Sequence, residues 1–276
     1  MTVVDRDVAV EEPASDHSGL TFARVLRAEW VRFRSLRSTW ITLAVTVVFV
    51  IGLGALFTAA RAAHWPPRDP GEALSFDPTR ASLGGAFLAQ LATGVLGVLL
   101  VTGEYSTGMI RATFTAVPRR LAVLTARVLV FAAVSLLVLV PTCIVAFVLG
   151  QHLLSPKHIQ TDFSAPGVTR AVFGAALYLV AIGLLGVALG WLLRHTAGAI
   201  AVLVALLLII EILVHLLPSP WPDRIAPYLP AEAGQALWTI KPDPHTLAPW
   251  TGFGVLMLYV ATSLIAAALL LHRRDV

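Results

Sequence analysis

Six long apolar runs, separated by polar connectors, constrain the fold of this chain more than any other feature. A helix of about 20 apolar residues, rising 1.5 Å per residue, crosses the hydrocarbon core of a bilayer. Only 13% of the 276 residues are charged, whereas soluble proteins carry about 25%. We therefore predict an all-α integral membrane protein. Its six spans are expected over residues 40–60, 83–102, 121–150, 171–193, 197–217 and 250–271.

The sequence divides into a short N-terminal tail and one membrane domain. Residues 1–19 are rich in acidic residues and poor in large apolar ones, which predicts a disordered cytoplasmic tail. Residues 20–276 are expected to form one six-span domain, which begins with an amphipathic helix over 20–36. That helix carries Trp30 on an apolar side and Arg27 and Arg34 elsewhere, a pattern typical of helices that lie in the membrane interface.

The connector between the second and third runs has the pattern of a docking element. Glu104 follows the second run almost directly, and Gly108 interrupts the backbone. Residues 109–117 predict a short helix, which Pro118 ends. The apolar side of this helix comprises Ile110, Phe114 and Val117.

Lys and Arg placement predicts the orientation of the chain, because cytoplasmic connectors of membrane proteins carry the excess of these residues. With both termini inside, 13 of the 20 Lys and Arg residues lie on the cytoplasmic side. The 103–120 connector then also faces the cytoplasm.

Two polar residues lie within the fifth run. Glu211 and His215 are four residues apart, on one face of the outer half of that helix. A carboxylate at the bilayer centre costs about 2.5–3.5 kcal/mol. The two residues either line the outer part of a substrate path or hold the outer loop near a gate, or they reach the outer interface or pair with each other. No metal site is expected, because two ligands are too few.

The long segment between the fifth and sixth runs predicts an outer surface or re-entrant helix over residues 231–240. We expect Trp221, Trp238 and Trp250 to anchor it as interfacial aromatic residues.

Motifs for chemistry are missing from the sequence. There is no P-loop, no H-E-x-x-H and no G-x-S-x-G, so we expect neither an enzyme nor a cofactor in this chain. Cys143 is the one cysteine, which excludes an internal disulfide. No basic–aromatic pattern for nucleic acid occurs.

Three stretches resemble a known family, the permease subunits of type-2 ABC exporters of the compact six-span bacterial kind. They are the basic amphipathic entry over residues 27–40, the Gly103-Glu-Tyr-Ser-Thr-Gly-Met-Ile-Arg111 stretch, and the long outer segment. The resemblance implies a bacterial plasma-membrane protein that pairs with a second permease chain, as a homodimer or heterodimer. Each chain would bind a separate ATP-binding subunit, which holds ATP and Mg²⁺.

The resemblance also implies roles for particular residues. The stretch that couples to the ATPase would comprise Glu104, Tyr105, Met109, Ile110, Arg111 and Phe114. The residues themselves leave two readings of Glu104 and Arg111: either both are ordinary charges at the inner surface, or Glu104 fixes the end of the second span against the docking helix by pairing with Arg111. The interfacial helix would contribute Arg27, Glu29, Trp30 and Arg34. Glu29 interrupts the apolar stripe, so it either reaches the headgroups or pairs with Arg32, or it contacts the ATPase or the docking helix. Two alternatives stay open, a secondary transporter and a membrane-embedded enzyme without an ATPase partner.

Overall fold

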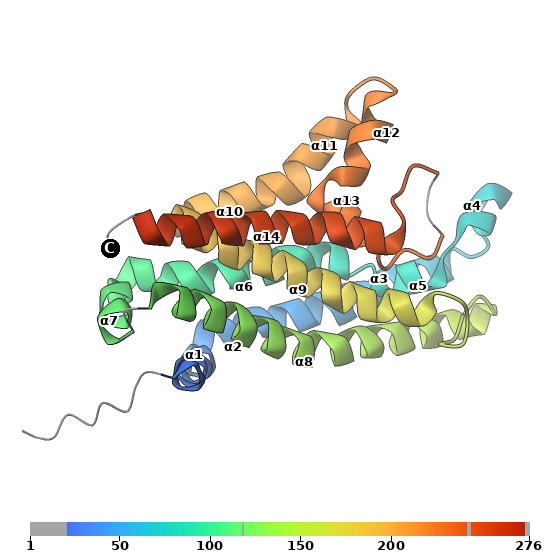
Figure 1. The fold of residues 1–276 in the computed structure, drawn as a ribbon. Helices are drawn as coiled ribbons and strands as arrows, with labels where there is room; N and C mark the ends of the chain where they lie inside the picture. Colours follow the sequence, from blue (N-terminus) through green and yellow to red (C-terminus); the bar gives the residue numbers. More distant parts are fainter. Residues whose placement is uncertain (1–20, 118, 242–243, 274–276) are drawn as a thin grey trace, which may run out of the picture.

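The computed structural model describes residues 21–117, 119–241 and 244–273. Every regular element in these ranges is helical, and six helical segments are long and apolar enough to cross a membrane. This confirms the predicted all-helical architecture (Figure 1). The tail predicted over residues 1–19 lies outside the described residues.

The observed segments extend the predicted spans by a few residues at most ends. Their elements are, in order, α2 (Arg37–Val48), η1 (Phe49–Leu53) and α3 (Gly54–Ala63); α5 (Pro78–Leu83) and α6 (Ala86–Thr107); α8 (Arg120–Leu154); α9 (Val168–Leu193); α10 (Thr196–Val204), η3 (Ala205–Ile209) and α11 (Ile210–His215); and α14 (Pro249–Arg273). The shorter elements are α1 (Phe22–Ser35), α4 (Pro70–Ser75), α7 (Met109–Ala116), η2 (Ser155–Lys157), α12 (Trp221–Ile225), η4 (Ala226–Tyr228) and α13 (Pro230–Gln235).

The fourth span, α9, is the centre of the bundle. In its most apolar stretch 89% of residues are buried, and in the second span 67% are, whereas the other four spans bury only 22–39%. α9 therefore packs against protein on nearly every side. The peripheral spans keep apolar faces free for lipid or for another chain.

Small residues bring α6 and α9 into backbone contact. A Cβ atom on Gly97 would overlap the carbonyl oxygen of Gly183, and one on Gly186 would overlap that of Gly94. A stripe of small and polar residues on α6 is buried, and it comprises Ala86, Gln90, Thr93 and Gly97. Close approach through small residues is how membrane helices gain van der Waals contact.

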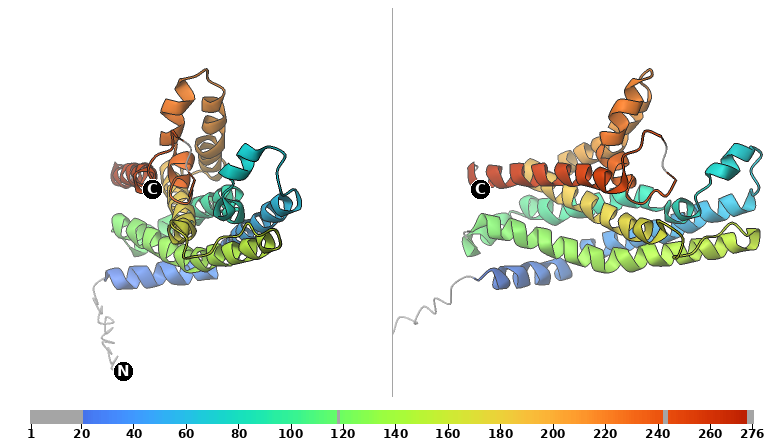
Figure 2. Two further views of the ribbon diagram at one scale, coloured as in Figure 1. Left: turned by 90° about the vertical axis from the view of Figure 1, so that its right-hand side faces the viewer. Right: turned by 45° about the vertical axis from the view of Figure 1, so that its right-hand side comes forward.

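The short helices lie at the two ends of the bundle. α1, α7 and the last turn of α14 lie at one end, which we call the α7 end, while α4, α12 and α13 lie at the other, the α13 end (Figures 1 and 2). Arg120 Nη1 donates to the Leu271 carbonyl at 2.9 Å and joins α8 to α14 at the α7 end. The even number of spans places the start of α1 and the end of α14 at the same end.

The segment after the fifth span differs from the prediction. The helix expected over 231–240 covers only Pro230–Gln235 (α13), and it packs inward on α9 and α14. This excludes the surface alternative, and the re-entrant alternative stays a prediction. Trp238 is only 2% exposed and lies 6.4 Å from Tyr178 between ring centroids, so its expected role as an interfacial anchor is wrong. Trp221 and Trp250 are 57% and 64% exposed, as an anchor requires.

Candidate functional site at the α7 end

The amphipathic helix α1 buries a narrow stripe with an acid in its middle. Val25, Glu29 and Phe33 are buried, and their spacing of four residues places them on one helix face. This face packs on α8. Trp30 is 42% exposed, and the arginines of the interfacial helix, Arg27 and Arg34, are also exposed.

Glu29 is buried because α8 supplies a cation directly opposite it. Arg127 donates from Nε to Glu29 Oε2 at 3.0 Å and from Nη2 to Glu29 Oε1 at 2.9 Å. Arg127 is 1% exposed. An arginine near the cytoplasmic end of a span commonly extends to the membrane surface, but the carboxylates inside the bundle hold this one.

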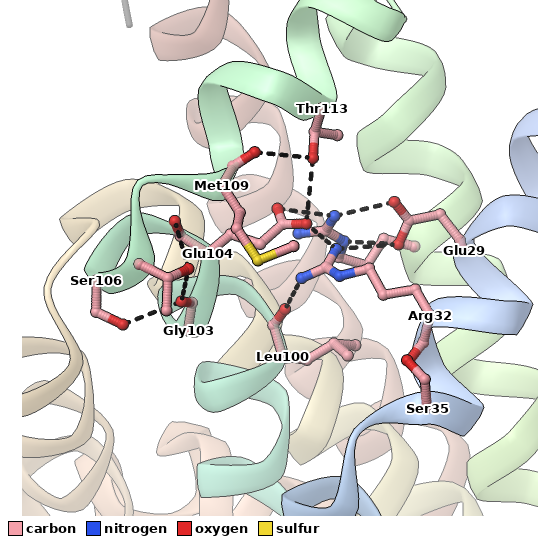
Figure 3. A network of polar contacts seen from close by, with 11 residues as sticks. Glu29, Arg32, Ser35, Leu100, Gly103, Glu104, Ser106, Met109 and Thr113 are labelled. Atoms are coloured by element: carbon pink, nitrogen blue, oxygen red, sulfur yellow. Dashed lines mark hydrogen bonds and ion pairs between the residues drawn. The ribbon is translucent and has the colours of Figure 1, made fainter.

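Glu104, at the end of α6, binds two arginines. One is Arg127, and the other is Arg32 of α1 (Figure 3). Its Oε1 lies 2.5 Å from Arg32 Nη1, and its Oε2 lies 3.1 Å from Arg127 Nη2. The second contact is an ion pair without the alignment of a hydrogen bond. Arg32 also lies 3.4 Å from Glu29 and donates to the Leu100 carbonyl at 3.0 Å.

Glu29, Arg32, Glu104 and Arg127 form what we call the charge cluster. It holds two carboxylates and two guanidinium groups, so its formal charge is zero. Burial and the neighbouring Arg127 lower the pKa of Arg32 to about 10, and the two carboxylates partly offset this; the guanidinium therefore stays charged at neutral pH. The cluster joins three elements, α1, α6 and α8, at one point.

The short helix α7 is attached to this cluster. Its Thr113 hydroxyl donates to Glu104 Oε1 at 3.4 Å, as well as to the Met109 carbonyl at 3.3 Å. Gly108, with φ of +71°, provides the sharp turn between α6 and α7. Ile110 is buried at 3% exposed, whereas Met109 is 59% exposed, so the helix presents one side to the bundle and another outward.

Two residues of the predicted docking stretch have side chains outside the described part, Arg111 and Phe114. The expected pairing of Glu104 with Arg111 is therefore not among the contacts the structure gives. The partners that it gives to Glu104 are Arg32 and Arg127, with Thr113 as a weaker one.

Aromatic rings continue the cluster into the bundle. The Arg127 guanidinium lies over the ring of Trp191 at 5.0 Å, and Tyr105 contacts Trp191 edge to face at 6.1 Å. Arg194, in the turn after α9, lies over Tyr105 at 5.4 Å. A guanidinium over an aromatic face is an attractive contact, so the central helix α9 is coupled to the same set of charges.

An open groove of about 570 Å³ lies between α1 and α7. It is lined by Arg24, Arg27, Ala28, Val31, Arg32, Ser35 and Met109. The groove thus combines basic side chains with an exposed thioether, and Arg32 connects it to the charge cluster.

The two polar residues of the fifth span lie at the α13 end. His215 Nε2 lies 2.6 Å from Glu232 Oε1, so His215 pairs with α13 and not with Glu211 as one alternative expected. Glu211 Oε2 is buried and has no hydrogen-bond partner among the described residues.

Sequence reasoning missed several members of these two sites. It gave Arg32 only a local role and did not consider the pairing of Arg127, or Thr113, Trp191 and Glu232. The sequence holds a signal for the first site, because Glu29 interrupts an apolar stripe and Arg127 lies inside the third apolar run on the same predicted side. Glu232 lies in a polar connector and gives no such signal.

A comparison with models of protein families and with curated proteins finds no match for this chain.

Proposed function

We propose that this chain is the membrane-spanning permease subunit of an ABC exporter, driven by a separate ATP-binding subunit that docks on α7. The observation that carries the proposal is the attachment of a small, partly exposed helix to a buried charge cluster joining α1, α6 and α8. Such an arrangement suits a helix that the ATP-binding subunit displaces, because a rigid connection transmits the displacement of α7 to the spans.

The docking surface comprises the exposed side of α7 and the groove beside α1. Met109 is 59% exposed, and methionine adapts to irregular partner surfaces. The arginines along the groove add positive charge, which would steer an acidic patch of the partner toward it. The ATPase would bind ATP and Mg²⁺, and this chain would carry no chemistry of its own.

The mechanism follows from the connections. ATP binding would draw two ATPases together and move α7 with them. Through Thr113 and Glu104 the displacement reaches α6, and through Arg127 it reaches α8 and the ring of Trp191 on α9. A second permease chain would pack on the exposed apolar faces of the peripheral spans, and the two bundles would rock between inward-facing and outward-facing states.

Co-purification with an ATP-binding subunit, sought first among the products of the neighbouring genes, tests the proposal. We expect the purified complex to hydrolyse ATP and Met109→Asp to abolish complex formation, because a carboxylate would replace the exposed apolar contact. Leu74→Asp is the matched control, since Leu74 is 80% exposed on α4 at the opposite end, and it should leave the complex intact.

Two results would overturn the proposal. One is transport of a solute by the purified chain alone in vesicles without nucleotide, which would favour a secondary transporter. The other is a complex that tolerates Met109→Asp as well as it tolerates Leu74→Asp.

A further inference from the structure

One histidine and two glutamates converge where the end of the fifth span meets α13. Glu211 and His215 lie one helical turn apart on α11, and Glu232 is on α13. One donor atom from each of the three lies within 4.8 Å of the others. The sequence supplied two of these ligands; the fold adds the third from 17 residues further along.

No lysine or arginine among the described residues forms an ion pair with Glu211 or Glu232, although Arg80 lines the adjacent cavity. Two carboxylates so close repel each other, and His215 contacts only one of them, Glu232, at 2.6 Å. Glu211 Oε2 is buried without a hydrogen-bond partner among the described residues, although its lone pairs need one. A cation that both carboxylates share would satisfy this oxygen and remove the repulsion.

The space next to the three side chains admits such a cation. They line a cavity of about 290 Å³, together with polar and charged residues that include Arg80, Asp223, Gln235, Thr239 and His245. The side chain of His215 is 54% exposed and that of Glu232 is 26% exposed. An ion can thus enter from solvent at the α13 end.

We propose that Glu211, His215 and Glu232 form a binding site for a divalent transition-metal ion of the zinc class. One imidazole nitrogen and two carboxylate oxygens are a donor set that Zn²⁺ accepts, with a fourth position left for water. Ligands at about 2.0–2.2 Å from the ion stand roughly 3.3 Å apart in a tetrahedron, so small side-chain rotations would close the group. The ion would bind His215 through a ring nitrogen that carries no hydrogen and would tie α11 to α13.

Titration of the full-length protein in detergent with Zn²⁺ tests the site. The protein is purified through a tag without histidine, and binding is followed by calorimetry, with Co²⁺ absorption as a spectroscopic readout. We expect one Zn²⁺ per chain and a tetrahedral Co²⁺ spectrum. Glu211→Gln and Glu232→Gln should each weaken Zn²⁺ binding at least about 10-fold, since even groups behind the ligands change affinity by 10–100-fold.

The chain provides matched controls. His64 and Glu72 are an exposed histidine and an exposed glutamate at the same end but outside the group, so His64→Ala and Glu72→Gln should bind Zn²⁺ like the unaltered protein. His215→Cys keeps a zinc ligand, and we expect it to retain binding and to add the intense near-ultraviolet thiolate band to the Co²⁺ spectrum.

The inference is overturned if the unaltered protein binds no Zn²⁺ at one equivalent, or if Glu211→Gln and Glu232→Gln bind as tightly as the controls. If a glutamine variant fails to fold, the titration of the unaltered protein and the His215→Cys spectrum still decide. Because no ATPase enters the assay, its outcome is independent of the proposed exporter function.

Discussion

Arg127 has carboxylate partners from two helices other than its own. It binds Glu29 of α1 through two nitrogens and lies beside Glu104 of α6. Removing one member of a buried ion pair leaves an uncompensated charge, which costs about 3–5 kcal/mol. The stability of the α7 end therefore depends more on this balance than on any single contact in it.

Arg127→Met should lower the free energy of unfolding by about 3–5 kcal/mol, because it leaves two carboxylates with Arg32 alone. Thermal unfolding of the purified protein in detergent measures the change. Arg61→Met is the matched control, since Arg61 pairs with Glu72 at the surface, where the side chains are 55% and 46% exposed. Such a pair contributes only about 0–1 kcal/mol.

A second variant separates charge balance from lost packing. Arg127→Met combined with Glu29→Leu leaves Arg32 with Glu104 and restores neutrality, so we expect it to recover at least roughly half of the lost stability. Equal destabilisation by the single and the double variant would contradict this account.

The helices owe their arrangement to two kinds of information. Long apolar runs are a local property, so the six spans were predictable within a few residues. The local contact of Glu29 with Arg32 was among the predicted alternatives. Its contact with Arg127 was not, because that residue lies 98 positions away and only the docking of α1 on α8 brings the two together. Trp238 was misplaced for a related reason: tryptophan is common both at membrane interfaces and in buried cores, and composition does not separate the two.

Gly97→Ala tests the contact between α6 and α9. The added methyl group would overlap the Gly183 carbonyl, and backbone cannot rotate away as a side chain can. We expect a loss of about 2–3 kcal/mol or more in the free energy of unfolding, measured in detergent. Gly103→Ala on the same helix is the control, because its added methyl group meets nothing within 4 Å. It should raise the free energy of unfolding by up to about 1 kcal/mol through helix propensity. Equal effects of the two changes would show that the contact between α6 and α9 is looser than described.

The turn before α7 is a second test at this scale. Gly108 has φ of +71°, where a side chain costs about 1–2 kcal/mol. Gly108→Ala should therefore speed hydrogen exchange of the α7 amides, while Gly108→Asn should have a smaller effect because asparagine tolerates this conformation. If the two variants exchange like the unaltered protein, the turn does not hold α7 in place.

The whole molecule is suited to labelling because Cys143 is fully buried in α8. A single new cysteine therefore reacts without background. Under the proposed orientation, Met109→Cys reacts with a membrane-impermeant maleimide only from the cytoplasmic side, whereas Leu74→Cys reacts in intact cells. Labelling of both cysteines from one side would contradict the six-span arrangement. Labelling of Met109→Cys from outside the cell and of Leu74→Cys from the cytoplasm would place α7 outside the compartment that contains ATP.

The charge cluster also imposes an order on biosynthesis. Glu29 is synthesised 98 residues before Arg127. The ion pair that holds α1 on α8 therefore cannot form until the third span has been made. Until then the carboxylate of Glu29 has only Arg32, one turn further along the same helix, as an ionic partner.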